Sequence, residues 1–257
     1  MSQRDPTQRF SDRAGLYAQH RPGYPPEVVA ILCEECGLTA EQTIADLGSG
    51  TGLLTEELLK NGNTVFAVEP NEAMRAEAEA RLGSNPRFHS VSGRSEATTL
   101  PDASVNLITV AQALHWFDPE PTKREFARLL RPGGRLAVVN NKRYDELSPM
   151  MAEIDDLLAQ HRETPEYGKG WWGWDDAACD FYFGPGGAVE RTCPNQQILD
   201  EEGFLGRWMS QSTIPHPGEP GHEELAGQLR AIFARDQQAG TVTVPYLTHV
   251  HCGRLAL

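Results

Sequence analysis

The sequence predicts a single α/β domain built on a mostly parallel sheet, and two observations lead to this prediction. Short apolar segments alternate with helical segments between residues 43 and 139, a pattern typical of βαβ units with parallel strands. A glycine-rich turn at residues 48–52 directly follows the first apolar segment, where a strand would pass into a crossover helix. The length of 257 residues fits one domain, or one domain with an insertion.

The predicted elements begin with a helix over residues 26–36, which Gly37 ends. Five short apolar segments are predicted strands: 43–47, 64–68, 87–91, 105–110 and 135–139. Three helices are predicted between them: 53–60, 71–82 and 118–130. Asn71 is a suitable helix cap, and Asp118 followed by Pro119 is a typical helix start.

The regular alternation ends after residue 141. The segment that follows contains many aromatic residues and glycines, and long irregular segments in compact domains are often lids or binding loops. Further elements are predicted towards the C-terminus: helices at 147–161, 199–209 and 222–237, a short strand at 210–214 and a final strand at 241–250.

The composition disfavours several classes of partner. The formal net charge is −13, whereas nucleic-acid binding needs a basic face to meet phosphates; anionic membranes are disfavoured for the same reason. No apolar run approaches the ~20 residues of a membrane span, and the first residues are polar without an apolar signal region. We therefore expect a cytoplasmic protein. Its five cysteines, including an isolated Cys33–Cys36 pair, are expected to be reduced.

The most specific motif is the stretch from Asp46 to Gly52, with glycines at 48, 50 and 52. Glycines here let the backbone approach a ligand at the N-terminus of the next helix. A dinucleotide fingerprint would require a third glycine at position 53, which is Leu. Glu69 lies at the end of the second predicted strand, where a carboxylate can accept hydrogen bonds from both ribose hydroxyls.

With these motifs, residues 43–139 resemble the class I S-adenosylmethionine-dependent methyltransferases of the methyltransferase-11-like group. Tyr17 with Arg21–Pro–Gly–Tyr–Pro, and the stretch from Ala111 to Asp118, resemble its trans-aconitate-methyltransferase-related branch. The resemblance implies a Rossmann-like fold, a seven-stranded sheet with an antiparallel last strand. It implies S-adenosyl-L-methionine as cofactor, S-adenosyl-L-homocysteine as product, and a small-molecule methyl acceptor.

The same resemblance implies a set of cofactor-binding residues and a division of the chain. The cofactor-binding set is Tyr17, Arg21, Asp46, Gly48, Ser49, Gly50, Gly52, Glu69, Pro70, Met74, Ser95, Glu96, Ala111 and Gln112. The segments of this single domain are expected to be an N-terminal cover (1–42), a cofactor-binding core (43–140), an inserted lid (141–200) and a C-terminal part that completes the sheet (201–257).

His115 is the candidate catalytic residue, because it follows the fourth predicted strand and imidazole titrates near neutral pH. It could take a proton from the acceptor, orient the acceptor, or only pack. Four tryptophans are candidates for a lid over the substrate, with packing onto the sheet as the alternative: Trp116, Trp171, Trp172 and Trp174.

Metal binding is not expected, since the histidines at 216, 222, 249 and 251 do not form two close ligand pairs. The oligomeric state is not predicted. Two other functions compete with methyl transfer. One is a protein that binds the cofactor without transferring a methyl group. The other is an NAD-dependent oxidoreductase, which Leu53 disfavours.

Overall fold

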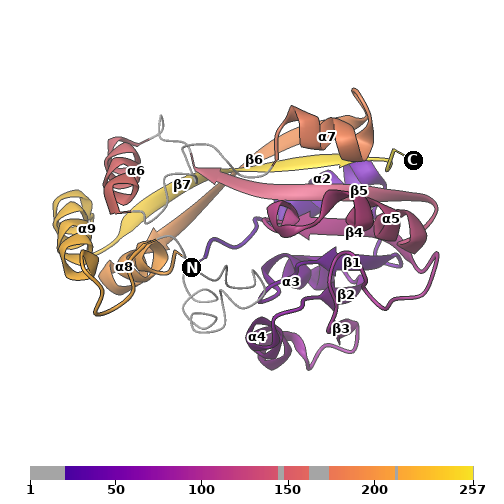
Figure 1. Ribbon diagram of the computed structural model, residues 1–257, viewed down its shortest axis with the longest axis horizontal. Helices are drawn as coiled ribbons and strands as arrows, with labels where there is room; N and C mark the ends of the chain where they lie inside the picture. Colours follow the sequence, from indigo (N-terminus) through magenta and orange to yellow (C-terminus); the bar gives the residue numbers. More distant parts are fainter. Residues whose placement is uncertain (1–20, 144–147, 162–173, 212–213, 257) are drawn as a thin grey trace.

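The computed structural model describes residues 21–143, 148–161, 174–211 and 214–256. Its centre is a seven-stranded sheet in the order β3-β2-β1-β4-β5-β7-β6 (Figure 1). The strands are β1 Thr43–Leu47, β2 Thr64–Val68, β3 Phe88–Val91, β4 Val105–Ala111, β5 Leu130–Arg143, β6 Ala188–Leu199 and β7 Val242–Gly253. Strand β7 is antiparallel to β5 and β6, and the pairs among β1–β5 are parallel. The predicted fold class is therefore confirmed.

Most of the described helices begin and end close to the predicted bounds, while α7 and the short turn η3 were not predicted. The described helices are α2 Glu27–Cys36, α3 Leu53–Lys60, α4 Glu72–Leu82, the short 3-10 turn η3 Leu114–Trp116, α5 Pro119–Leu129, α6 Pro149–His161, α7 Asp176–Phe183, α8 Glu201–Met209 and α9 His222–Asp236. The Asn71 side chain accepts a hydrogen bond from the Met74 N–H and caps α4, and Gly37 ends α2 in the left-handed conformation. No helix among the described residues combines the length and apolar character needed to cross a membrane.

Two hydrophobic layers cover the two faces of the sheet. One face packs against α2, α3 and α4, and Leu32 and Leu58 of these helices belong to one buried cluster with Ile44 of β1. The other face packs against α5 and α7, where Phe126 and Tyr182 belong to one buried cluster with neighbouring strand residues. The strand order reverses between β1 and β4, and ligands of open α/β sheets bind at the carboxyl ends of the strands at such a point.

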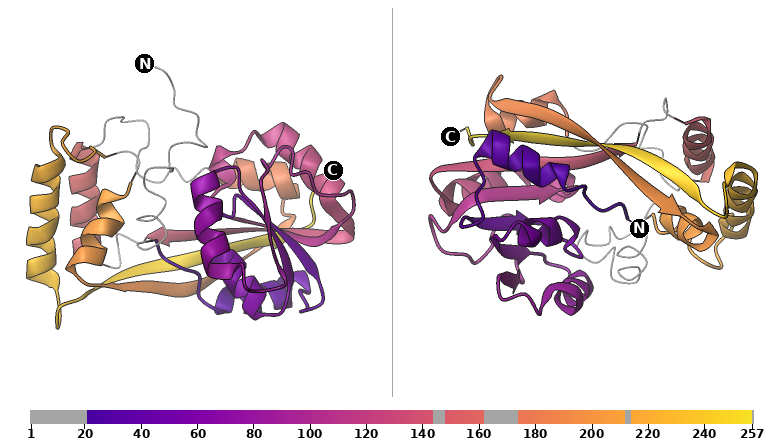
Figure 2. Two further views of the ribbon diagram at one scale, coloured as in Figure 1. Left: turned by 90° about the horizontal axis from the view of Figure 1, so that it is seen from below. Right: turned by 180° about the vertical axis from the view of Figure 1, so that it is seen from behind.

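A third cluster lies at the far end of the sheet. Strands β6 and β7 extend past the rest of the sheet, and α6, α8 and α9 pack where these strands project (Figures 1 and 2). Trp208 is the largest fully buried side chain there. Arg143 at the end of β5 forms an ion pair with Asp155 of α6 at 2.7 Å, which ties this cluster to the central sheet.

The sixth strand differs from the prediction. It was expected near residues 210–214, but it is β6, within the segment predicted as a lid; Ser210 instead follows the last turn of α8. The reason is that β6 is an edge strand, with many exposed polar side chains and Pro194 in its middle, which an edge tolerates. Residues 188–199 are therefore part of the sheet, and β7 with its two histidines lies inside the sheet between β5 and β6.

Candidate active site

The glycine-rich turn connects β1 to α3 at the point where the strand order reverses. Gly48, Gly50 and Gly52 all have positive φ, between 56° and 82°, a conformation that side chains with a Cβ rarely adopt. A Cβ on Gly48 would lie 2.6 Å from the Cβ of Ala113. Within the described part of the chain, a Cβ on Gly50 would meet nothing within 4 Å, so a ligand can approach the backbone there.

Asp46 supports this turn from beneath. Its side chain is 1% exposed, and its two carboxylate oxygens accept hydrogen bonds from the hydroxyls of Thr55 on α3, at 2.6 Å, and Thr109 on β4, at 2.8 Å. Burial raises the pKa of Asp46 to about 6, and these two hydroxyls oppose the rise. In this structure Asp46 thus joins β1, α3 and β4.

Glu69 lies on the other side of the turn, directly after β2. One carboxylate oxygen accepts a hydrogen bond from the Gly50 N–H at 3.0 Å, and the other accepts one from the Asn71 N–H at 2.9 Å. Burial raises the pKa of Glu69 above its ordinary value, against the lowering effect of these two bonds and of Arg75. A carboxylate offers about four acceptor sites, so both oxygens retain acceptor capacity.

Four residues of the implied cofactor-binding set follow strands β2 and β3 in the sequence. Pro70 follows Glu69, while Met74 is a buried residue of α4. Ser95 is buried and accepts a hydrogen bond from the Thr122 hydroxyl at 3.4 Å. A carboxylate oxygen of Glu96 accepts a bond from the Asp118 N–H at 3.0 Å. Ser95 and Glu96 are therefore held against α5 and its start.

Ala111 is the last residue of β4, one position beyond the predicted strand, and Gln112 follows it. Gln112 has a φ of 53°, a left-handed conformation that is uncommon for a residue other than glycine and often occurs at functional sites. Its N–H donates to the Val139 carbonyl at 3.1 Å, and its side-chain amide donates to the Asn141 carbonyl at 2.8 Å. These bonds hold the end of β4 against β5.

The positive charge of Arg21 acts on His115 beyond the end of β4, although the two residues are 94 positions apart in the sequence. Burial first, and then this charge, lower the pKa of His115 to about 4. His115 is therefore neutral at pH 7. The ring of Trp116 lies 4.7 Å from that of His115, centroid to centroid.

The other lid candidates have different positions. Trp174 is buried and contacts the Phe183 ring edge-on at 6.0 Å, so it packs the start of α7 against the sheet. Phe183 and Tyr182 belong to the same buried cluster. Tyr17, Trp171 and Trp172 lie outside the described residues, and their expected roles stay predictions.

Sequence reasoning missed a polar network beside this site. The Asn141 side chain donates to the Gly23 carbonyl at 3.2 Å and accepts hydrogen bonds from Asn195 on β6 and Thr248 on β7. Asn195 also donates to the Gly23 carbonyl, at 2.9 Å. The network fixes the chain that leads to Arg21 against three strands. Nothing in the spacing of these residues could have indicated it, because the contacts join distant segments.

Comparison with known proteins adds a similarity to this geometry. Residues 45–138 match the family model described as a methyltransferase domain. This part of the chain is similar to methyltransferase domains. The match extends from β1 into β5 and includes the glycine-rich turn, Glu69 and His115.

Relatives of the methyltransferase domain extend the likeness to most of the chain. An uncharacterized methyltransferase of Mycobacterium tuberculosis is 39% identical over 159 residues, which is 62% of this chain and 62% of the relative. An uncharacterized methyltransferase-like protein of Schizosaccharomyces pombe is 27% identical over 246 residues, covering 93% and 92%. A solved structure, a proposed type II methyltransferase from Anaeromyxobacter dehalogenans, has a TM-score of 0.66 and 25% identity over 91% of this chain and 97% of that one. None of these three names states an acceptor.

Proposed function

We propose that this protein transfers the sulfonium methyl group of S-adenosylmethionine to a small-molecule acceptor. The observation that carries the proposal is the Glu69 carboxylate next to the Gly50 N–H, 3.0 Å away, at the switch point of a methyltransferase-type sheet. In this proposal Glu69 is the ribose acceptor, beside a backbone turn at a helix N-terminus.

The residues present fit the cofactor. Gly50 has open space where a side chain would be, so the nucleoside can contact the backbone there. Glu69 keeps its two backbone bonds and still has acceptor capacity for two ribose hydroxyls. Arg21 carries a planar guanidinium suited to the methionine carboxylate, and its charge acts at His115, next to the end of β4.

In the proposed reaction the bound cofactor supplies a methyl group on a good leaving group, so the chain has to position the reactants. Holding two reactants in line is worth up to about 7–11 kcal/mol. Gln112 fixes the end of β4 through its two bonds to β5. His115 is neutral at pH 7, and a neutral imidazole can both donate and accept a hydrogen bond. We assign it the orientation of the acceptor, with proton removal as the competing role.

A small acceptor is supported by the charge of −13, which disfavours nucleic acid. Membership of the trans-aconitate-methyltransferase-related branch is supported by Arg21–Pro–Gly and by the stretch from Ala111 to Asp118. Under this proposal the acceptor is a small molecule whose own charge is compatible with the positive charge of Arg21.

Two measurements test the proposal. S-adenosylmethionine and S-adenosylhomocysteine should raise the melting temperature, whereas NAD should not; a ligand at 100 times its dissociation constant stabilises by about 2.7 kcal/mol. Incubation with methyl-labelled cofactor and a cell extract should label a small molecule. Cofactor binding without any labelled product would favour the binding-only alternative, and stabilisation by NAD alone would favour the oxidoreductase.

A further inference from the structure

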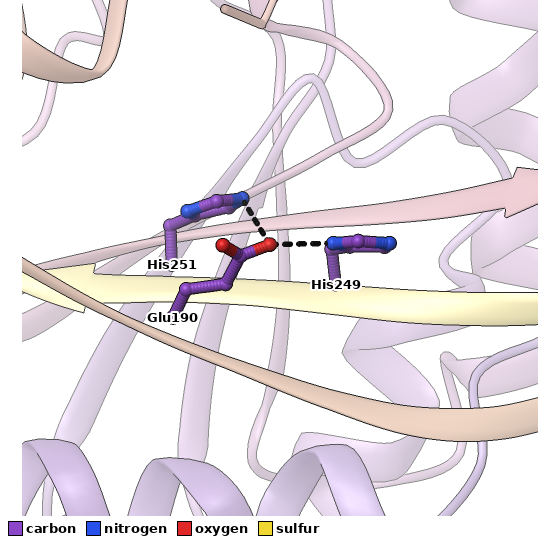
Figure 3. A group of neighbouring side chains, drawn as sticks. All are labelled: Glu190, His249 and His251. Atoms are coloured by element: carbon purple, nitrogen blue, oxygen red, sulfur yellow. Dashed lines mark hydrogen bonds and ion pairs between the residues drawn. The ribbon is translucent and has the colours of Figure 1, made fainter. Parts of the chain in front are cut away.

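Two histidines of β7 and a glutamate of β6 form a compact group outside the candidate active site (Figure 3). The Nδ1 of His249 lies 2.6 Å from a carboxylate oxygen of Glu190, and the Nε2 of His251 lies 3.6 Å from the same oxygen. The three ligand atoms all lie within 4.8 Å of one another. The group therefore offers two imidazoles and one carboxylate to a single point.

The strand geometry explains why these side chains converge. His249 and His251 are two residues apart on β7, and residues at this spacing point to the same face of a sheet. Glu190 pairs directly with His251 in the antiparallel register and is the diagonal neighbour of His249. Figure 3 shows all three side chains on one side of the ribbon of β6 and β7.

Burial distinguishes this group from an ordinary surface pair. Both histidines are buried, and the Nε2 of His251 has no hydrogen-bond partner among the described residues despite its burial. A buried ring nitrogen without a partner carries a cost in free energy. Trp174 packs against the His251 ring at 5.1 Å between centroids. The Glu190 side chain is 49% exposed, so solvent and ions can reach the point where the three ligand atoms meet.

The donor set determines which ions fit. Two imidazole nitrogens with one carboxylate suit divalent zinc and similar first-row metals, whereas magnesium and calcium prefer oxygen ligands. Ligand atoms of a tetrahedral zinc site lie about 3.3 Å apart, given Zn–N distances of about 2.0–2.1 Å. The separations of 2.6 and 3.6 Å from Glu190 lie on either side of this value, so small side-chain rotations suffice.

We propose that Glu190, His249 and His251 bind one zinc-type divalent metal ion, with a fourth position open to solvent. The site is separate from the glycine-rich turn. His249 pairs with Asn140 of β5. Asn140 follows Val139, whose carbonyl accepts a hydrogen bond from the Gln112 N–H. The metal would therefore lie near the same edge of the sheet as the end of β4, about 10 Å away by the usual strand spacing. The proposal does not depend on methyl transfer.

A positive charge on the same face opposes the ion. Lys142 lies two residues after Asn140 on β5 and faces the same side, and its charge acts on both Glu190 and His251. Lys142→Met is expected to tighten zinc binding by about fivefold, the order expected for a unit charge acting through water over a few ångströms. A Lys142→Met variant that binds zinc no better would place the ion elsewhere.

The main test is zinc titration of the full chain after removal of metal with a chelator. One zinc per chain is expected by calorimetry and by metal analysis after desalting. His249→Ala, His251→Ala and Glu190→Gln should each weaken zinc binding more than about tenfold, since even the outer partners of metal ligands are worth about 10–100-fold. The proposal is overturned if the wild-type protein binds no zinc, or if the three variants bind zinc as tightly as wild type. The group would then be only a hydrogen-bonded carboxylate and imidazole.

Controls exclude other ligands. His89→Ala removes an exposed histidine of β3, and Cys33→Ser removes an exposed thiol of α2; both should bind zinc like wild type. If Cys33→Ser abolishes binding, the site is at the thiols and the proposal fails. Cobalt spectra of the wild-type chain give a second measurement that does not require variants to fold. A spectrum without a thiolate charge-transfer band is expected, and a strong thiolate band would contradict the assignment.

Discussion

The Glu69 carboxylate accepts the Gly50 N–H at 3.0 Å and so connects the end of β2 to the turn that follows β1. Its second oxygen accepts the Asn71 N–H at the start of α4. One side chain therefore holds two backbone segments around the proposed ribose position. A substitution at Glu69 should affect ligand affinity more than stability, because the turn also keeps the bonds of Gly48 and Ser49 to the Val68 carbonyl.

Glu69→Ala is expected to weaken S-adenosylhomocysteine binding at least tenfold with the fold intact. Hydrogen bonds to a charged group are worth about 1.5–3 kcal/mol each, and about 1.4 kcal/mol corresponds to a factor of ten. Titration calorimetry measures the affinity and circular dichroism checks the fold. Glu72→Ala, which removes an exposed charge from the first turn of α4, should bind like wild type. Unchanged affinity in Glu69→Ala would mean that Glu69 does not hold the ribose.

Alanine at two glycines of the turn should separate folding from binding. Both substitutions require a left-handed alanine, at a cost of about 1–2 kcal/mol. Gly48→Ala adds a contact of 2.6 Å with Ala113, so it should lower the melting temperature strongly. Gly50→Ala adds no contact within 4 Å among the residues that the structure describes, so it should melt only slightly lower but lose cofactor affinity. Equal cofactor affinity of Gly50→Ala and wild type would place the ligand away from Gly50.

Asp46 should make stability fall as pH rises. Its pKa is about 6 when folded and 3.8 ordinarily, so between these values the folded chain holds a proton that the unfolded chain has lost. The cost is absent below pH 3.8, grows through this window and is complete above pH 6, at about 3 kcal/mol. In Asp46→Asn this slope should disappear, because the amide does not titrate.

The measurement for Asp46 is the free energy of unfolding in urea from pH 4 to pH 7, compared between wild type and Asp46→Asn. An amide can accept from one threonine hydroxyl and donate to the other, so the variant should fold. Asp180→Asn, at an exposed position of α7, controls for the loss of a carboxylate and should keep the wild-type slope. Parallel pH curves for wild type and Asp46→Asn would show that Asp46 titrates normally.

The core of the fold could be predicted from the sequence because its signals are local. Strands β1 to β5 are apolar segments next to turns, and the Asn71 cap and Gly37 stop depend on neighbouring residues only. The glycine spacing with Glu69 also indicated two segments that lie together in the structure. Parallel strands place their carboxyl ends at one edge, which explains why residues far apart in the sequence could be expected there.

The rest depends on contacts between distant segments. The sequence of β6 is mostly polar because β6 is an edge strand of the sheet. Even its apolar residue Ile198 is 64% exposed. The pairing of β6 with β7 alone brings Glu190 to His249, 59 positions away. The Asn141 network joins residues up to 172 positions apart. Periodicity carries no information on such partners, so neither the network nor the histidine group could be predicted.

Burial, and after it the positive charge of Arg21, lower the pKa of His115 to about 4. An ordinary histidine would give a pH–rate limb near 6.5, but the structure predicts a limb near pH 4 and no change due to His115 between pH 6 and 8. Arg21→Gln should raise the pKa of His115, because it removes the positive charge. Titration of the imidazole by NMR in both proteins measures this shift. An unchanged pKa would show that the charge of Arg21 does not act on His115.

Two substitutions of His115 should distinguish its roles once the acceptor is known. A general base contributes about 10²–10⁴-fold to kcat, so both His115→Ala and His115→Asn would lose that factor. An orienting residue can be replaced in part by Asn, which still forms hydrogen bonds. We expect His115→Asn to keep kcat within about tenfold of wild type and to raise KM less than His115→Ala does. This outcome fits a side chain whose low pKa makes it a weak proton acceptor. Equal losses of kcat above a hundredfold in both folded variants, with cofactor affinity unchanged, would instead assign His115 as the base.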